Sequence, residues 1–253
     1  MTRSGRNIGS TKLWRYISFS RFVWMLCRES LWMSRADLLG DEWEMRISRR
    51  EVEAAARVIV KRDGIERTEA YRRLSAEINE LRQSTFVNCW TAANFESHAM
   101  WSVYCGTGEG VAVQTALAAL AENVSAPVGS VGATVETVSY DKSEMPYPFA
   151  AEQLATRKRK PFEYEQERRI IAVNTGTNWF PWSDERGFSM ALSENLAGGF
   201  AMKCDTESLI KAILVHPRAD ESILEAVTTV TERFAPRLVD RVKQSRMAKR
   251  PPL

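Results

Sequence analysis

The chain has 253 residues, of which 44% are hydrophobic and 26% are charged, so it is long enough to bury a substantial core within one large domain. Its formal net charge is only +3, and its basic character is local, because residues 233–253 hold seven lysines and arginines and a single acid, Asp240. Four widely spaced cysteines and two histidines offer no paired ligand spacing for zinc, which argues against a Cys/His metal site.

No segment combines a basic start, an apolar run and a small-residue cleavage site, and no apolar stretch approaches the roughly 18 residues of a membrane-spanning helix. We therefore expect a cytoplasmic protein with reduced thiols and no membrane partner.

Hydrophobic periodicity predicts helices mainly in one block between early and late strands, which favours an α+β fold over a regularly alternating parallel sheet. The predicted strands cover residues 12–16, 31–33, 85–90, 111–113, 133–140 and 209–215, together with a strand that starts at residue 165 and runs to 173. The predicted helices cover residues 49–62, 66–83, 96–104, 115–122, 149–159 and 220–234, and Ser20 is expected to cap another near residues 22–27. Because Asp63-Gly64 separates the two charged helices 49–62 and 66–83, they are expected to form an inserted helical hairpin.

These elements predict one domain over residues 12–235, between a flexible polar segment, residues 1–11, and a basic tail, residues 236–253. A basic terminal segment that contains Pro251-Pro252 is typical of a solvated end, with a contact to nucleic acid or to a protein partner as the alternative.

The acidic run around Glu165 and Glu167 carries the most specific chemical signal. Residues two apart on a strand point to the same side, so both carboxylates are expected to face one cavity. The alternatives are a strand edge protected by charge, or an acid that pairs with Arg169 across the sheet.

Other candidate motifs point to ordinary structural roles. Gly106, Gly108 and Gly110 precede a predicted strand instead of opening a helix, so they indicate a turn and not a nucleotide-binding loop. His98 would activate Cys89 or another cysteine only if the two were neighbours in space, and no local feature marks a reactive thiol.

Three groups of motifs resemble a bacterial family catalogued as domain of unknown function 2971, over roughly residues 13–225. The first group comprises residues 13–19, 31–34 and 40–44, where Gly40 and Glu42 stand in place of the family's Asn and Pro. The other two groups comprise residues 88–91 with Met100-Trp101, Tyr104 and 110–113, and then Lys160 with residues 164–169. The family name carries no activity.

The order of three short motifs is also similar to that of the ADP-ribosyltransferases of the R-S-E type. Arg15, Thr91 and the run Glu165-Gln166-Glu167 follow in the order of that family's early arginine, central Ser/Thr and late Glu/Gln-x-Glu. The resemblance implies an ADP-ribosyltransferase-like fold with a split or mixed sheet, and NAD as the substrate.

The same resemblance implies a role for each residue. Arg15 would hold the NAD diphosphate, and Thr91 would support the site by hydrogen bonding. Glu167 would stabilise the oxocarbenium-like ribose and Glu165 would orient or deprotonate an acceptor, which would be a protein or a nucleic acid. The ring of Tyr16 or of Trp101 would stack on nicotinamide, and the enzyme would act as a toxin or an anti-phage effector.

Two other functions remain open at this stage. A non-catalytic module that binds nucleic acid or protein predicts scattered site residues and exposed tryptophans beside basic side chains, with Trp14, Trp90, Trp179 and Trp182 as candidates. A nuclease predicts magnesium bound by acids, and the candidates are Asp41, Glu42, Glu165 and Glu167.

Overall fold

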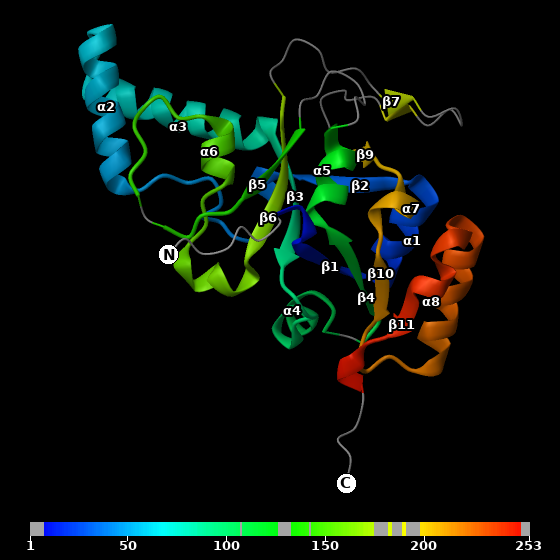
Figure 1. The fold of residues 1–253 in the computed structure, drawn as a ribbon. Coiled ribbons are helices and arrows are strands. Elements are labelled where there is room, and N and C mark those ends of the chain that lie inside the picture. Colours follow the sequence, from blue (N-terminus) through cyan, green and yellow to red (C-terminus); the bar gives the residue numbers. More distant parts are fainter. Residues whose placement is uncertain are drawn as a thin grey trace.

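The computed structural model describes residues 8–106, 108–125, 133–141, 143–174, 182–183, 189–190 and 198–248. At its centre lies a mixed sheet (Figure 1), in which nine of the described strands run in the order β11-β10-β4-β1-β3-β2-β9, with β6 joined to β3 and β5 joined to β6. Their bounds are β1 Lys12–Ser18, β2 Ser30–Arg35, β3 Thr85–Ala92, β4 Gly110–Ala116, β5 Ala133–Thr137, β6 Glu167–Val173, β9 Gly199–Lys203, β10 Ala212–Val215 and β11 Val242–Gln244. Among the described strands, only β10 and β11 pair in parallel. The predicted α+β class and mixed sheet are confirmed.

The sheet splits at β3. One edge of this strand pairs with β6 along its length, from Thr85 opposite Val173 to Thr91 opposite Glu167. The other edge is shared, since β2 pairs near Val87 and β1 pairs at Thr91 and Ala92. Among the described strands, none pairs with residues 88–90 on this edge. Side chains fill part of the gap: the Asn88 amide donates to the Trp32 carbonyl at 2.8 Å, and the Arg15 guanidinium donates to the Cys89 carbonyl at 2.7 Å.

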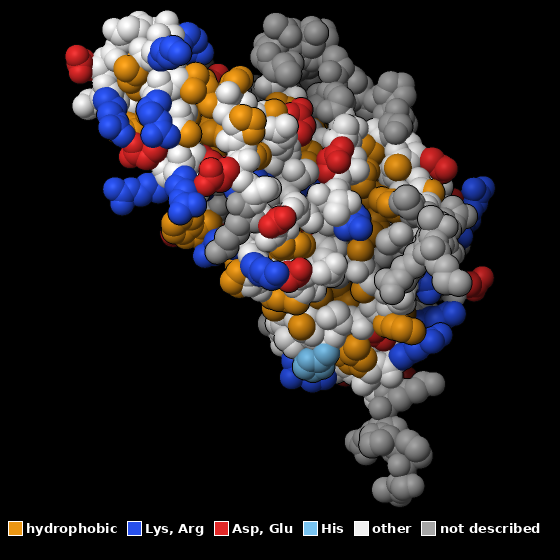
Figure 2. Space-filling view, turned by 60° about the vertical axis from the view of Figure 1, so that its left-hand side comes forward, with side chains coloured by type: hydrophobic (Ala, Val, Ile, Leu, Met, Phe, Trp, Pro, Cys, Tyr) orange, Lys and Arg blue, Asp and Glu red, His pale blue; other side chains and the backbone are white. Residues whose placement is uncertain are grey.

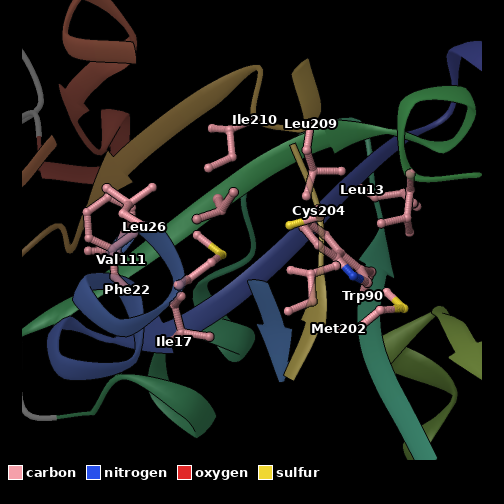
Figure 3. Packing of buried hydrophobic residues seen from close by; sticks show 14 of the residues in the cluster. Leu13, Ile17, Phe22, Leu26, Trp90, Val111, Met202, Cys204, Leu209 and Ile210 are labelled. Carbon is pink, nitrogen blue, oxygen red and sulfur yellow. The ribbon is translucent and has the colours of Figure 1, made fainter. Parts of the chain in front are cut away.

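Helices α1 (Phe19–Arg28), α5 (Leu117–Ser125) and α8 (Glu221–Phe234) cover one side of the sheet (Figure 1). The alternation along β1 explains this layer, because Leu13 and Ile17 point into the same apolar cluster as Phe22 of α1 (Figure 3). The intervening Trp14 and Tyr16 belong to a second cluster on the other side, which is completed by α4 (His98–Tyr104). Each face of β1 therefore contributes to a different core.

The predicted helical pair forms α2 (Arg49–Asp63) and α3 (Arg67–Ser84), inserted between β2 and β3. Ser48 and Glu51 cap α2 reciprocally, and Gly64 ends it with a left-handed φ of 65°. Buried residues of both helices pack with Val87, Ile171 and the short helix α6 (Ala151–Ala155). The outer surface of the pair carries side chains of both signs (Figure 2).

Two local predictions were wrong, and two strands were missed. Ser18, and not Ser20, caps α1, because its hydroxyl accepts from the Arg21 amide at 3.4 Å. Residues 149–159 form only the short α6, after which Lys160–Glu165 is a 3₁₀ helix with Pro161 in its first turn. Pro161 fits this position because its missing N–H would have no partner at a helix start. The strands β9 and β11 were not predicted from the sequence.

The expected solvated tail is also corrected, since residues 236–248 belong to the folded domain. A 3₁₀ helix, Pro236–Arg241, leads into β11 and then into a last helical turn, Arg246–Ala248. Leu238 is fully buried in the main apolar cluster. Glu96 also fastens this segment to the start of α4, because its carboxylate accepts from the Ser245 hydroxyl at 2.5 Å and from the Arg246 amide at 2.9 Å.

In the part of the chain that the structure describes, no helix is long and apolar enough to cross a bilayer.

We expect Leu238→Ala to lower the free energy of unfolding by about 2–5 kcal/mol, because it leaves a cavity beside a side chain that is fully buried. Urea denaturation followed by circular dichroism measures this change. Met247→Ala, at an exposed position in the same segment, serves as the control and should change the free energy by less than about 0.5 kcal/mol. Equal, small effects of the two changes would restore the solvated-tail interpretation.

Candidate active site

A cavity of about 470 Å³ opens at the split of the sheet. Its walls come from β1, β3 and α4, from residues 38–41 and Glu44, and from six residues between Lys158 and Arg169. Five of the six residues singled out in the sequence line it: Arg15, Tyr16, Thr91, Glu165 and Glu167. Segments that lie as far apart in the chain as residues 15 and 167 thus meet in one place.

Lys158 joins the two predicted carboxylates. Its ammonium group lies 2.6 Å from Glu165 Oε2 and 2.9 Å from Glu167 Oε1. The other oxygen of Glu167 accepts from Arg169 Nε at 2.6 Å, and Arg169 in turn forms an ion pair with Glu44. Each of these five side chains is at least nine-tenths buried. They form a continuous network of buried charges on one wall of the cavity.

The two acids do not share a strand as predicted. Glu165 is the last residue of the 3₁₀ helix, Gln166 adopts a left-handed φ of 45°, and β6 begins at Glu167. On β6 the residue that shares a face with Glu167 is Arg169, two positions later. The carboxylates nevertheless reach the same ammonium group, because the turn at Gln166 folds Glu165 back toward Lys158.

Of the two alternative interpretations of the acidic run, the protected strand edge is wrong and the ion pair with Arg169 is confirmed in part. β6 is not an edge strand, because it lies between β3 and β5. Arg169 does pair with an acid, but Glu167 is on the same strand, and the second partner, Glu44, comes from the loop before α2.

The network drives the pKa values of the two carboxyl groups apart. Burial raises the pKa of Glu165 to about 7, and the neighbouring Glu167 adds to this rise. Burial alone would also raise the pKa of Glu167, but the positive charges of Arg169 and Lys158 outweigh it and lower this pKa to about 2. Burial likewise opposes the charge of Lys158, yet the two carboxylates raise its pKa above the ordinary value. Near neutral pH, Glu167 is ionised and Glu165 exchanges its proton.

Arg15 extends from β1 into the split. Burial lowers the pKa of its guanidinium. Its hydrogen bond to the Cys89 carbonyl uses one of five N–H donors, and no described carboxylate lies within ion-pair distance of it. The geometry therefore leaves a half-buried cation with donors able to bind an anionic ligand in the cavity.

The two candidate aromatic residues have different surroundings. Tyr16 lines the cavity, and its hydroxyl accepts from the Ser97 amide at 2.7 Å. Trp101 does not line the cavity: it is 1% exposed, packs edge-on against Tyr16, and donates its indole N–H to Glu96 at 2.9 Å. Trp101 thus supports Tyr16 and has no free face on which a ligand could stack.

Thr91 and Cys89 lie on the β3 wall of the cavity. Thr91 is opposite Glu167 on β6, so the two residues share a face of the sheet. Burial raises the pKa of the Cys89 thiol to about 12, and that of Cys105 to about 11, which leaves both thiols protonated and unreactive near neutral pH. The ordinary structural interpretation of the cysteines agrees with these surroundings.

Sequence reasoning missed Lys158 and Glu44 as members of the site. Lys158 stands in a basic run after a short helix and belongs to no motif. Glu44 ends the 40–44 motif, but that motif implies no role for it, and it lies more than 100 residues before its partner Arg169. The only available signal was electrostatic, since two acids facing one buried cavity require a nearby cation.

Three of the four acids proposed to bind magnesium, Asp41, Glu165 and Glu167, line the cavity, but each of them is paired with a cation of the chain. Asp41 pairs with Arg159 at 2.7 Å, and Lys158 occupies the position between Glu165 and Glu167 that a cation would take. Within the described ranges, no group of three or more His, Cys, Asp or Glu side chains could hold a metal ion.

Comparisons with known proteins found no matching family model, no matching curated protein and no matching solved structure.

We expect Glu165→Gln to change how stability depends on pH. A carboxyl group whose pKa is raised in the folded state binds extra protons between about pH 4.5 and 7, so its contribution to stability falls as pH rises through this window. Glu165→Gln has no titrating carboxyl group at this position. The difference between its free energy of unfolding and that of wild type should therefore rise by about 2–3 kcal/mol from pH 4.5 to 7.5. Urea titrations across this range measure the difference.

Glu163→Gln is the matched control, because Glu163 lies on the same 3₁₀ helix with an exposed side chain. The difference between its free energy of unfolding and that of wild type should stay constant across this pH range. A constant difference between Glu165→Gln and wild type across the range would contradict the raised pKa.

Proposed function

We propose that this chain is an NAD-consuming enzyme, either an ADP-ribosyltransferase or an NAD glycohydrolase, with a macromolecular acceptor. The observation that carries the proposal is the convergence of Arg15, Thr91, Glu165 and Glu167 on one buried cavity. The order of their motifs in the sequence predicts these four residues without any use of geometry. Motif order does not by itself require residues so distant in sequence to meet.

The proposed reaction breaks the bond between nicotinamide N1 and ribose C1′. Nicotinamide leaves with the bonding electron pair and becomes neutral, so it needs no proton, and positive charge develops on the ribose. A fixed carboxylate beside that charge lowers the barrier electrostatically. Glu167 suits this role because Lys158 and Arg169 hold it ionised and oriented.

The acceptor completes the reaction when its hydroxyl, amine or other nucleophile, or water, bonds to C1′ and releases a proton. Glu165 is suited to take this proton, because a base acts best when its pKa lies close to the working pH. Arg15 would hold the diphosphate and keep the ribose in place. Tyr16 remains the candidate aromatic contact for nicotinamide.

A macromolecular acceptor is supported by the mouth of the cavity. Val103, Tyr104 and Tyr164 line the cavity and are 46–56% exposed, so apolar and aromatic surface continues from the site to the exterior. A toxin or anti-phage effector would use such a surface to engage its target.

The alternative, a non-catalytic binding module, has less support. It predicts scattered site residues and exposed tryptophans, whereas Trp14 and Trp90 are buried. Trp179 lies outside the described residues, and for Trp182 only its place in the short strand β7 (Trp182–Ser183) is described.

The test is nicotinamide release from NAD, with and without cell extract. Wild type should release nicotinamide, and Glu167→Gln should reduce the rate by about 100-fold or more, which is typical when one electrostatic contact to a transition state is lost. Glu163→Gln should keep the wild-type rate. Circular dichroism and a thermal melt check that Glu167→Gln is folded.

Arg15→Gln provides an independent variant outside the carboxylate network, and it should raise the KM for NAD. No release by wild type in the presence of extract would reject the proposal and favour the binding module. A folded Glu167→Gln protein with the wild-type rate would reject the assigned site.

A further inference from the structure

A second cavity, of about 260 Å³, adjoins the candidate active site. Trp24 and Met25 of α1 line it together with residues 30–32 of β2. Arg15, Ile17 and Arg21 line both cavities, so the two spaces share a wall. The proposed reaction at the carboxylates does not use this second space.

Arg15 lies in the wall that the two cavities share. Side chains alternate along β1, so Arg15 leaves the sheet on the side of Ile17 and α1, while Tyr16 and Glu167 face the other side. The guanidinium nevertheless reaches the Cys89 carbonyl in the split of β3. Its donors are therefore within reach of a ligand that passes through the split.

A second guanidinium, Arg21, lies at the same junction. Within the described part of the chain, neither Arg15 nor Arg21 has a carboxylate within ion-pair distance. Burial is the largest cause of the lowered pKa of the Arg15 guanidinium. Cys89 acts in the opposite direction, and the positive charge of Arg21 lowers this pKa further. Two neighbouring arginines that repel each other are stabilised by an anion, and their forked donors match phosphate oxygens.

The far wall of the second cavity is aromatic. The rings of Trp24 and Trp32 pack edge to face with their centroids 5.7 Å apart, and both are only partly buried. Such rings provide surfaces on which a nucleobase can stack. The carboxylates thus lie in the first cavity, the two arginines line both cavities, and the aromatic rings lie in the second.

We propose that the two cavities form one bipartite site for a dinucleotide, in which Arg15 and Arg21 bind the diphosphate and the second nucleoside stacks in the pocket of Trp24 and Trp32. The proposal rests on the proposed function for its first half, where the nicotinamide riboside would lie beside Glu167. It adds a binding pocket and Arg21, which no sequence motif indicates.

Separate titrations of the full chain with ADP and with nicotinamide mononucleotide test the second pocket, with dissociation constants measured by calorimetry. Trp24→Leu should weaken ADP about tenfold, within the range that base stacking on an aromatic ring contributes, and weaken nicotinamide mononucleotide less than twofold. Arg21→Gln should weaken ADP about as much. Trp24→Phe keeps an aromatic face and should restore most of the affinity.

Trp43→Leu is the matched control, because Trp43 is 60% exposed and lines neither cavity. It should leave both dissociation constants unchanged. No binding of ADP to wild type, or equal losses for both ligands in Trp24→Leu, would overturn the bipartite site.

The NAD assay separates this inference from the proposed function. Cleavage of NAD by Trp24→Leu with a wild-type KM would overturn the second pocket while the transferase proposal stands. Trp24-dependent binding of ADP without NAD cleavage by wild type would leave the nucleotide pocket intact and reject the transferase proposal.

Discussion

The division of one edge of β3 between two strands is the constraint on which the rest of the structure depends. Because β2 takes the start of this edge and β1 takes its end, the backbone groups of residues 88–90 face a gap. Buried backbone polar groups need partners, and Arg15 supplies one from outside the strand ladder. The same gap lets an arginine of the α1 side reach the cavity that contains the carboxylates. A continuous sheet would have separated them.

The charges around Lys158 are the second consequence of this architecture. Lys158, Glu165, Glu167, Arg169 and Glu44 are all removed from water, which costs several kcal/mol for each ion unless partners compensate. With Glu165 protonated, the remaining two cations and two carboxylates balance. The network joins the loop before α2, the segment after α6 and strand β6, so it fixes three separate walls of the cavity at once.

Much of the fold could be predicted from the sequence, because periodicity reports which face of an element is buried. The helices α2 and α3 were located to within a residue or two, since each repeats its apolar residues every three or four positions and Gly64 separates them. β9 and β11 lack such a signal: they are short, and their formation depends on pairing with β2 and β10. The prediction of a solvated tail was wrong because the basic composition of this segment does not reveal that Leu238 is buried.

The candidate site followed a similar division. Arg15, Thr91 and the two acids could be selected because they stand in short motifs to which a chemical role attaches. Lys158 stands in no motif and Glu44 in one without an assigned role, so only the fold shows that Lys158 binds the acids and that Glu44 binds Arg169. Trp101 shows the limit of residue type as a guide. An aromatic ring suits stacking and core packing equally, and its burial between Tyr16 and His216 decides the matter.

The separation of the two carboxyl pKa values is the feature of this network that the proposed reaction would use. A structural network gains most when every carboxylate is fully paired and ionised, as Glu167 is between Lys158 and Arg169. Glu165 has a single cationic partner, which it shares with Glu167, and its burial keeps a proton bound up to about pH 7. An under-compensated carboxyl group is a cost to stability, and such costs are concentrated where chemistry needs a group that exchanges protons. The position of Glu165 on the cavity wall, beside a carboxylate that stays charged, provides both an acid–base group and a fixed negative charge in one site.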